Sequence, residues 1–123
     1  MSNIKVFEND LPKDLDLSNE KFIGLDNEAL GLVLGRDPLT LVQLGLESKN
    51  FYLIKLNRET YHAPNLIKAL SNDNTQYIMH YARQDLLWLK YHLNVKPKNI
   101  FCTKVASKIA RTASSYHGYK DLV

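Results

Sequence analysis

The sequence predicts an α/β protein in which helices flank a mixed β-sheet. Three apolar segments, residues 22–25, 39–46 and 51–56, come first, and helical spacing of apolar residues begins after Pro64. Consecutive strands with short connections are antiparallel neighbours, whereas strands joined through a helix are usually parallel. We therefore expect an antiparallel three-strand meander that parallel strands extend, with helices packed on the sheet.

Length and composition are typical of one globular domain. The chain has 123 residues, 45% of them hydrophobic and 24% charged, so we expect a single domain over residues 1–123. No segment approaches the roughly 20 apolar residues of a membrane helix, and the start MSNIKVFEND lacks the apolar core of a signal peptide. We expect no membrane association and a cytoplasmic location. Cys102 is the single cysteine, which excludes a disulfide framework and a thiolate metal site.

The N-terminal half contains the predicted meander. The strand at 22–25 is bounded by charged residues and is interpreted as buried, with apolar residues on both faces. Pro38 marks the entry to the next strand, because proline can begin a strand but not lie inside a central one. The predicted strands of this half are an edge strand over Ile4–Phe7 and the three of the meander.

The C-terminal half alternates between helix and strand. Its predicted elements are a helix from Pro64 to Leu70, a strand over 76–80, a helix from Arg83, a strand over 100–103, a basic helix over 104–112 and a last helix from His117. In the Arg83 helix, the buried stripe consists of Leu86, Leu89 and Leu93, widened by Leu87 and Trp88. In the basic helix, Val105, Ile109 and Thr112 are expected to face inward.

Two acidic residues follow the first strand of the meander. Side chains alternate in extended chain, so Asp26 and Glu28 project from one face at roughly 6.5 Å, and Asn27 points away. Carboxylates placed in this way repel each other unless a cation lies between them, and oxygen ligands favour Mg²⁺ or Mn²⁺. A solvated loop is the alternative interpretation of the same three residues.

Asp85 is a candidate third carboxylate. It lies in the first turn of the Arg83 helix, at the edge of the buried stripe. An acid near a helix N-terminus is stabilised by the helix dipole and needs no function. However, this helix follows the 76–80 strand, which should lie beside the first strand of the meander, so Asp85 is placed to join Asp26 and Glu28.

Charge is unevenly distributed along the chain. Residues 1–60 contain 10 acidic and 7 basic residues, a net charge of −3, whereas residues 61–123 contain 3 acidic and 9 basic residues, a net charge of +6. An acidic pocket beside a basic flank suits a polyanion that is held through metal ions. Scattered, solvated lysines are the alternative explanation.

Five segments in the same order resemble the ribonuclease D type of 3′–5′ exonuclease, within the DEDD superfamily. FIGLDNEALGL resembles the first exonuclease motif, usually Asp-Thr-Glu, and RDPLTLVQLGL the strand after it. APNLIKAL is similar to the first helix and IMHYARQDLLWL to the second motif. FCTKVASKIARTASSYHGYKDLV is similar to the segment that leads toward the third motif. The resemblance covers nearly the whole chain.

The resemblance implies a ribonuclease H-like fold and two-metal hydrolysis of phosphodiester bonds at RNA 3′ ends, with Mg²⁺ or Mn²⁺. It implies that Asp26 bridges two divalent ions, that Glu28 binds one, and that Asp85 supports the other partly through water. Leu30 then lies where the terminal nucleotide is contacted. His80 and Arg83 flank the second motif and are candidates to approach the substrate, although a strand histidine is more often a packed core residue.

Two features depart from the family pattern. Asn27 stands where threonine is usual, and its effect is expected to be confined to local packing and hydrogen bonding. No Tyr-x-x-x-Asp third motif follows His117, since Tyr119 precedes Asp121 by two residues. The domain is therefore expected to be incomplete at its C-terminus and to associate with itself or with a complementary C-terminal fragment.

Two functions stay open for such a chain. The first is an exoribonuclease that acts on single-stranded RNA 3′ ends, with tRNA precursors among the candidate substrates. The second is a catalytically inactive, nucleic-acid-binding remnant, or a fragment that needs another chain. A structural protein unrelated to nucleic acid fits the ordered set of matches less well.

Overall fold

The computed structural model describes residues 3–110 and 116–122. Within these residues, six strands form one sheet in the order β1-β4-β3-β2-β5-β6. The strands are β1 (Asn3–Glu8), β2 (Phe22–Ala29), β3 (Leu39–Leu46), β4 (Asn50–Lys55), β5 (Gln76–Met79) and β6 (Ile100–Cys102). β3 is antiparallel to β2 and to β4, whereas β1–β4, β2–β5 and β5–β6 are parallel pairs. The predicted mixed sheet, its meander and the central place of β2 are confirmed.

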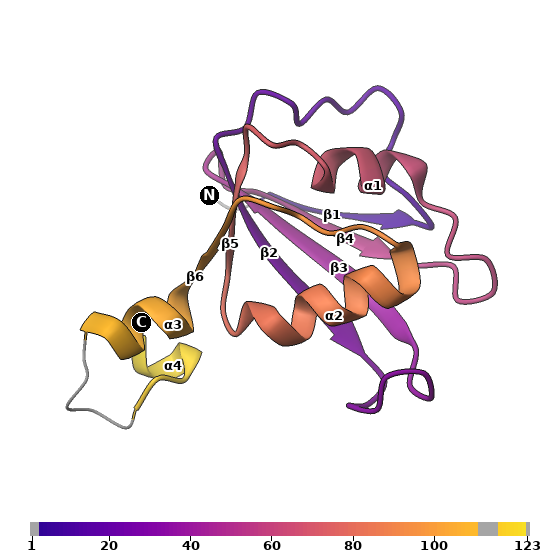
Figure 1. Ribbon diagram of the computed structural model, residues 1–123. Coiled ribbons are helices and arrows are strands. Elements are labelled where there is room, and N and C mark those ends of the chain that lie inside the picture. The colour runs from indigo at the N-terminus through magenta and orange to yellow at the C-terminus, as the bar shows by residue number, and fades with distance from the viewer. Residues whose placement is uncertain (1–2, 111–115, 123) are drawn as a thin grey trace.

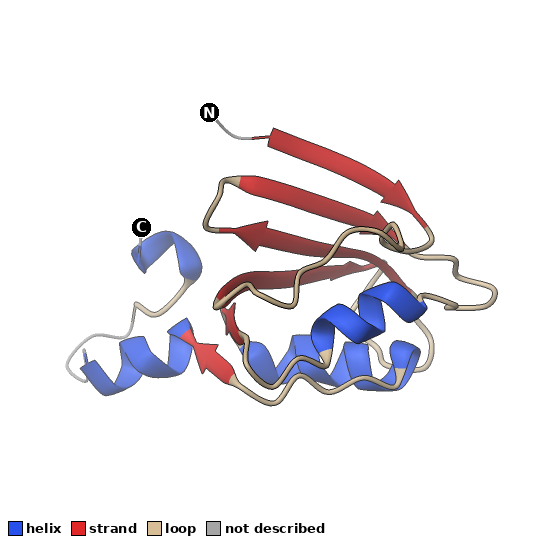
Figure 2. Cartoon of the chain, turned by 90° about the horizontal axis from the view of Figure 1, so that it is seen from above, coloured by secondary structure: helices blue, strands red, loops and turns tan. Residues whose placement is uncertain are grey.

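The helices are distributed unevenly around the sheet. α1 (Pro64–Leu70) and α2 (Ala82–Leu93) lie on the same side of it (Figures 1 and 2). α3 (Thr103–Ala110) and α4 (Tyr119–Leu122) lie beyond the β6 edge (Figure 1). None of the helices in the described residues is long and apolar enough to cross a membrane.

The core fills the space between the sheet and the helices α1 and α2. Ile23 and Leu25 of β2 are buried there, together with Leu66 of α1 and Leu89 of α2. Burial of such side chains supplies about 1.5–3 kcal/mol each. This packing fixes the position of α2 over the sheet, and with it the position of any side chain in its first turn.

The opposite face of the sheet is open in the described part of the chain, which corrects the interpretation of β2 as apolar and buried on both faces. Gly24 pairs with Gly45 of β3 and Ile78 of β5, and this row continues to Phe51 of β4. Phe51 and Ile78 are each 37% exposed. The helices α1 and α2 lie on the other side of the sheet (Figures 1 and 2).

Several element boundaries differ from those predicted. Asp26 and Glu28 lie inside β2 rather than after it. β5 ends at Met79, so His80 lies outside the strand, and Thr103 begins α3 rather than ending β6. Hydrogen-bonded pairing with β3 carries β2 further than its apolar residues alone suggest.

Two predictions about buried helix faces are wrong. Leu87 is 49% exposed, because the face of α2 that packs on the sheet is formed by Ala82, Trp88, Leu89 and Leu93. In α3, Val105 and Ile109 are 54% and 74% exposed, and Ser107 is the buried residue. α3 lies past the last strand, where no sheet surface is available to cover its apolar side. Thr112 lies outside the described residues.

The N-terminus of α1 is capped by a residue from a distant loop. Ala63 occupies the N-cap position and offers no side-chain hydrogen bond. Instead, the Asp10 carboxylate accepts hydrogen bonds from the backbone N–H groups of Asn65 (3.0 Å) and Leu66 (2.8 Å). Because the first N–H groups of a helix have no partner within it, this carboxylate stabilises α1 and anchors the loop.

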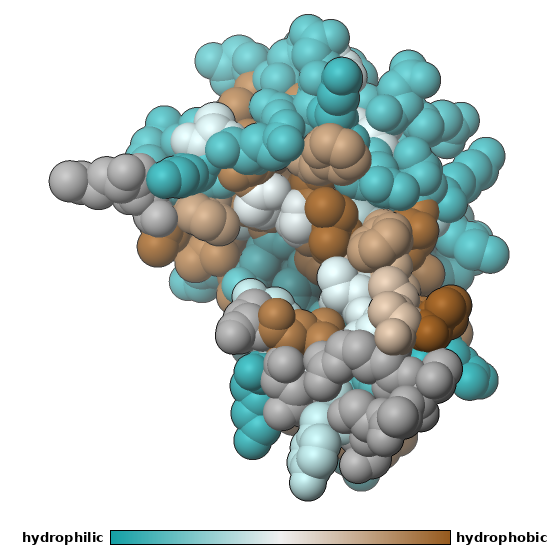
Figure 3. Space-filling model, turned by 90° about the vertical axis from the view of Figure 1, so that its left-hand side faces the viewer, coloured by the Kyte–Doolittle hydropathy of each residue, from teal (hydrophilic) through white to brown (hydrophobic). Residues whose placement is uncertain are grey.

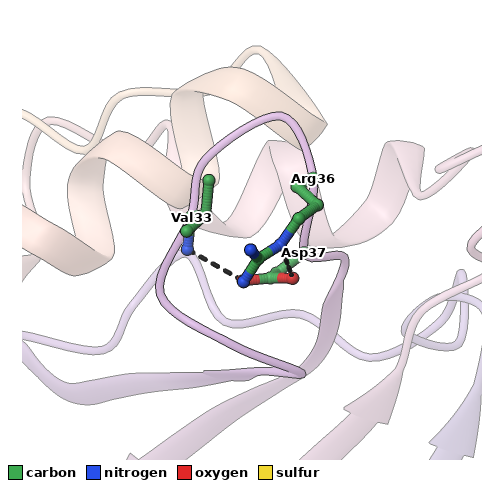
Figure 4. A network of polar contacts seen from close by, with 3 residues as sticks. All are labelled: Val33, Arg36 and Asp37. Carbon is green, nitrogen blue, oxygen red and sulfur yellow. Dashed lines mark hydrogen bonds and ion pairs between the residues drawn. The ribbon is translucent and has the colours of Figure 1, made fainter.

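The β2–β3 loop is organised around Asp37 (Figure 4). Its carboxylate accepts hydrogen bonds from the Val33 N–H at 2.9 Å and from the Arg36 guanidinium at 2.8 and 2.9 Å. The Arg36 hydrogen bonds, followed by that of Val33, lower the pKa of Asp37 to about 2. A Cβ atom at Gly31 would overlap this carboxylate, so any other residue there would have to displace the Asp37 side chain.

Candidate active site

The alternation of β2 places two carboxylates on the open face of the sheet. Ile23 and Leu25 point to the core, so Asp26 and Glu28 point to the opposite face, while Asn27 faces α2. The β2–β3 pairing is irregular at Glu28, where Thr40 of β3 is an extra residue. The Thr40 hydroxyl donates a hydrogen bond to the Glu28 carbonyl at 3.0 Å. The extra residue of the bulge, Thr40, therefore fixes the backbone of β2 at Glu28.

Asp85 reaches the same end of β2 from α2. β5 is the parallel neighbour of β2, and the chain turns from β5 directly into α2. Tyr81 makes this turn in the left-handed backbone region, at φ 56°, an unfavourable conformation for a bulky residue. Asp85 lies one turn later, and its carbonyl accepts a hydrogen bond from Asn27 Nδ2 at 3.1 Å. The predicted approach of Asp85 to Asp26 is present in the structure.

The surroundings of Asp85 alter its acidity. Burial is the first cause that raises the pKa of Asp85, to about 7, and the charge of Asp26, a hydrogen bond between the two carboxyl groups and the charge of Glu28 add to it. Asp26 and Asp85 are thus in contact, with Glu28 nearby. In this conformation, no three acidic, histidine or cysteine side chains of the described residues are gathered closely enough to enclose a metal ion.

The chemistry of the three side chains fits a hard divalent cation. All three offer carboxylate oxygens, which Mg²⁺ and Mn²⁺ prefer, and they repel one another when ionised. This repulsion adds to burial, the first cause, in raising the pKa of Asp85. A divalent cation would relieve it by replacing the proton that the pair otherwise retains.

A groove of about 580 Å³ on the open face adjoins Asp26. Its walls include Gly24, Phe51, Ile78 and His80. Figure 3, which views the molecule from the side of β6, α3 and α4, shows exposed hydrophobic side chains beside a hollow. The groove is mainly apolar and includes the carboxylate of Asp26, a combination suited to an amphiphilic ligand such as a nucleotide.

His80 is the one predicted substrate-contacting residue that lines this groove with Asp26. Its Nδ1 lies 2.9 Å from the Thr103 hydroxyl, and its ring meets that of Tyr119 edge-on at 6.0 Å. Leu30, 65% exposed, and Arg83, in the first turn of α2, are not among the described residues that form the groove walls.

The sequence matches a family model described as 3′–5′ exonuclease over residues 5–123. The chain belongs to the 3′–5′ exonuclease family. The ordered segments that resemble the ribonuclease D type are confirmed at the level of the family, and the six-stranded mixed sheet is its ribonuclease H-like fold. No curated protein matches the chain significantly.

Solved structures similar to this exonuclease-family chain include NrnC of Brucella melitensis. NrnC bound to pGG superimposes with a TM-score of 0.91 and 35% identity, covering 99% of this chain and 59% of NrnC. NrnC with bound Mg²⁺ gives a TM-score of 0.91 and 36% identity, covering 98% and 59%. This chain therefore spans somewhat more than half the length of NrnC.

Ribonuclease D of Escherichia coli, an exoribonuclease involved in structured RNA processing, is a more distant match. It gives a TM-score of 0.67 at 18% identity, and the match covers 85% of this chain and 27% of the ribonuclease D chain. At this identity the likeness concerns the fold alone.

Sequence reasoning missed two contacts at the site of this exonuclease-family chain. Asn27 was expected to have only a local effect, yet its side chain bonds the backbone of Asp85, 58 positions away. Thr40 was not singled out, and it holds the Glu28 carbonyl. The Asn27 contact depends on how α2 packs on the sheet, and the Thr40 contact on a bulge. The one available signal was the departure from threonine at position 27.

Proposed function

We propose that this chain is a divalent-metal-dependent 3′–5′ exoribonuclease domain that hydrolyses phosphodiester bonds at the 3′ end of single-stranded RNA. The observation that carries the proposal is the contact between the carboxyl groups of Asp26 and Asp85, which come from β2 and α2. Family membership and the Mg²⁺ bound to NrnC support it.

Each acidic residue has a role in this proposal. Asp26, Glu28 and Asp85 supply oxygen ligands for two divalent ions, Mg²⁺ or Mn²⁺. Such ions offset the negative charge that develops on a phosphodiester during hydrolysis. Asp26 acts on Asp85 through its charge and through a hydrogen bond, and its side chain shares the face of Glu28. It is therefore the residue best placed to contact both ions.

The substrate contacts are assigned to the surroundings of these acids. His80 lines the groove that adjoins Asp26, where a nucleotide would lie. Exposed Leu30 directly follows β2 and offers an apolar contact to the terminal nucleotide, and Arg83 offers a positive charge to a phosphate. The net charge of +6 over residues 61–123 favours binding of a polyanion.

Short RNA is the first substrate class to test, because NrnC has been solved bound to pGG. Longer single-stranded RNA and tRNA precursors stay candidates. Base discrimination is expected to be weak, since phosphate contacts and stacking carry little sequence information.

The decisive experiment incubates the purified chain with pGG and with a 5′-labelled single-stranded RNA, in Mg²⁺, Mn²⁺ or EDTA. We expect products that shorten from the 3′ end, and no products in EDTA. Asp26→Ala and Asp85→Asn should each lower the rate by about 10²–10³ or more. Asp73→Asn, at an exposed acid outside the site, is the matched control. RNA binding without EDTA-sensitive cleavage would reject hydrolysis and favour the binding-module alternative.

A further inference from the structure

Asn27 lies between two of the proposed metal-binding acids. In β2 it has the orientation of buried Ile23 and Leu25, so its side chain points toward the helix side of the sheet. There its Nδ2 donates a hydrogen bond of 3.1 Å to the carbonyl oxygen of Asp85, in a partly buried environment. This contact joins the central strand directly to the first turn of α2.

The backbone of Asn27 contacts Asp26. Its N–H donates a hydrogen bond of 2.9 Å to Oδ1 of Asp26. Asn27 therefore makes two contacts with the acids. Its backbone N–H binds the side chain of Asp26, and its side-chain amide binds the backbone of Asp85. Both acids are oriented from the same point of β2.

The first turn of α2 needs such an external restraint. Its N-cap residue Tyr81 provides no side-chain hydrogen bond and is in the left-handed backbone region. The Ala82 N–H reaches only the Cys102 sulfur, at 3.4 Å, which is a weak acceptor.

We propose that Asn27 is a positioning residue: its side-chain amide fixes the Asp85 backbone so that the Asp85 and Asp26 carboxylates face a common metal position. The role rests on the proposed function, because it concerns the same metal site. Removing a group that hydrogen-bonds to a metal ligand and orients it typically weakens metal affinity by roughly 10–100-fold.

The test measures Mn²⁺ affinity rather than activity alone. Free Mn²⁺ is titrated with the full chain and followed by electron paramagnetic resonance, and thermal melting in EDTA reports stability without metal. Asn27→Leu has a similar size but donates no hydrogen bond, whereas Asn27→Thr retains a donor on a shorter side chain. Asn65→Leu is the matched control, because Asn65 Nδ2 likewise donates to a backbone carbonyl, that of Leu11, at 2.9 Å.

We expect Asn27→Leu to weaken Mn²⁺ binding by about 10–100-fold, Asn27→Thr to recover part of the loss, and Asn65→Leu to leave affinity unchanged. Equal Mn²⁺ affinity in the wild type and Asn27→Leu, or the same loss in Asn65→Leu, would overturn the positioning role even in a chain that degrades RNA. Weakened Mn²⁺ binding in Asn27→Leu, in a chain that cleaves no RNA, would support the role and reject the proposed hydrolysis. Mn²⁺ uptake that survives Asp26→Ala would overturn the metal site itself.

Discussion

The carboxyl groups of Asp26 and Asp85 share a hydrogen bond although 58 residues of chain separate them. One belongs to the central strand and the other to the helix that follows the neighbouring parallel strand. Burial, followed by the charge of Asp26, raises the pKa of Asp85 to about 7, so the pair retains a proton near neutral pH. Acidity and divalent cations should therefore influence the stability of the protein through this pair.

The first prediction concerns pH. Asp85 has its pKa raised from 3.8 to about 7, so the folded state binds a proton that the unfolded state has lost. The stabilisation is complete below about pH 4 and is lost as the pH rises toward 7. Urea unfolding in EDTA at pH 5 and pH 8 should show this loss in the wild type, and Asp85→Asn should lack it.

His92 makes the opposite contribution to the pH dependence of stability, and comparing the wild type with Asp85→Asn cancels it. Burial lowers the pKa of His92 below 6.5, and this destabilises the folded state as the pH falls. Both proteins contain His92, so the difference between the wild type and Asp85→Asn isolates Asp85. An identical pH dependence in both would contradict the assignment. Added Mg²⁺ should stabilise the wild type more at pH 8 than at pH 5, because fewer protons then compete for the carboxylates.

The second prediction concerns the cap of α1. Asp10→Ala removes the acceptor for two N–H groups at the start of the helix, so the free energy of unfolding should fall by about 1–2 kcal/mol. Urea denaturation monitored by circular dichroism measures the change. Asp14→Ala, at an exposed acid of the same loop, should change stability by less than about 0.5 kcal/mol. Equal effects of the two substitutions would exclude the capping role.

The third prediction concerns the loop held by Asp37. Gly31→Ala places a methyl group against the Asp37 carboxylate, which must then leave the Val33 N–H and Arg36. Hydrogen exchange of the Val33 amide should accelerate. Asp37→Asn should accelerate it as well, and the double variant should add little, because both changes break the same contacts.

Gly24→Ala is the control for the steric argument. A Cβ atom there would meet the Gly45 carbonyl oxygen at 3.7 Å, an ordinary contact, so the loop should exchange as in the wild type. Additive effects of Gly31→Ala and Asp37→Asn would show that the two residues act separately.

Sequence patterns predicted the elements better than the surfaces they cover. The meander, β3 at Leu39–Leu46 and α1 at Pro64–Leu70 follow from local spacing and from proline at the element starts. The exposure of Val105 and Ile109 was not predictable, because an apolar helix stripe indicates that the stripe needs cover and not whether the described chain supplies it. The same reason explains the open face of β2.

The candidate site was predictable as residues but not as a network. Strand alternation and the parallel placement of β5 beside β2 brought Asp26, Glu28 and Asp85 to one sheet end. Leu39 and Val42 are three positions apart, so regular alternation would put them on opposite faces, yet both are buried. The bulge at Thr40 explains this, and it is visible only in the pairing of β3 with β2. The hydrogen bonds made by the Asn27 and Thr40 side chains depend on how the helix and the bulge are placed in the folded sheet.

The pairing of β1 with β4 bears on the order in which the fold assembles. Asn3 pairs with Asn50, so the edge strand can join the sheet only after the intervening meander exists. Closing so long a loop costs entropy before any contact repays it, which slows such pairings relative to local hairpins. During synthesis, β1 is the first of the described strands to be made, and it must wait for a partner that arrives more than forty residues later. We expect the β2–β3–β4 meander to be the early structure and the outermost strand to dock last.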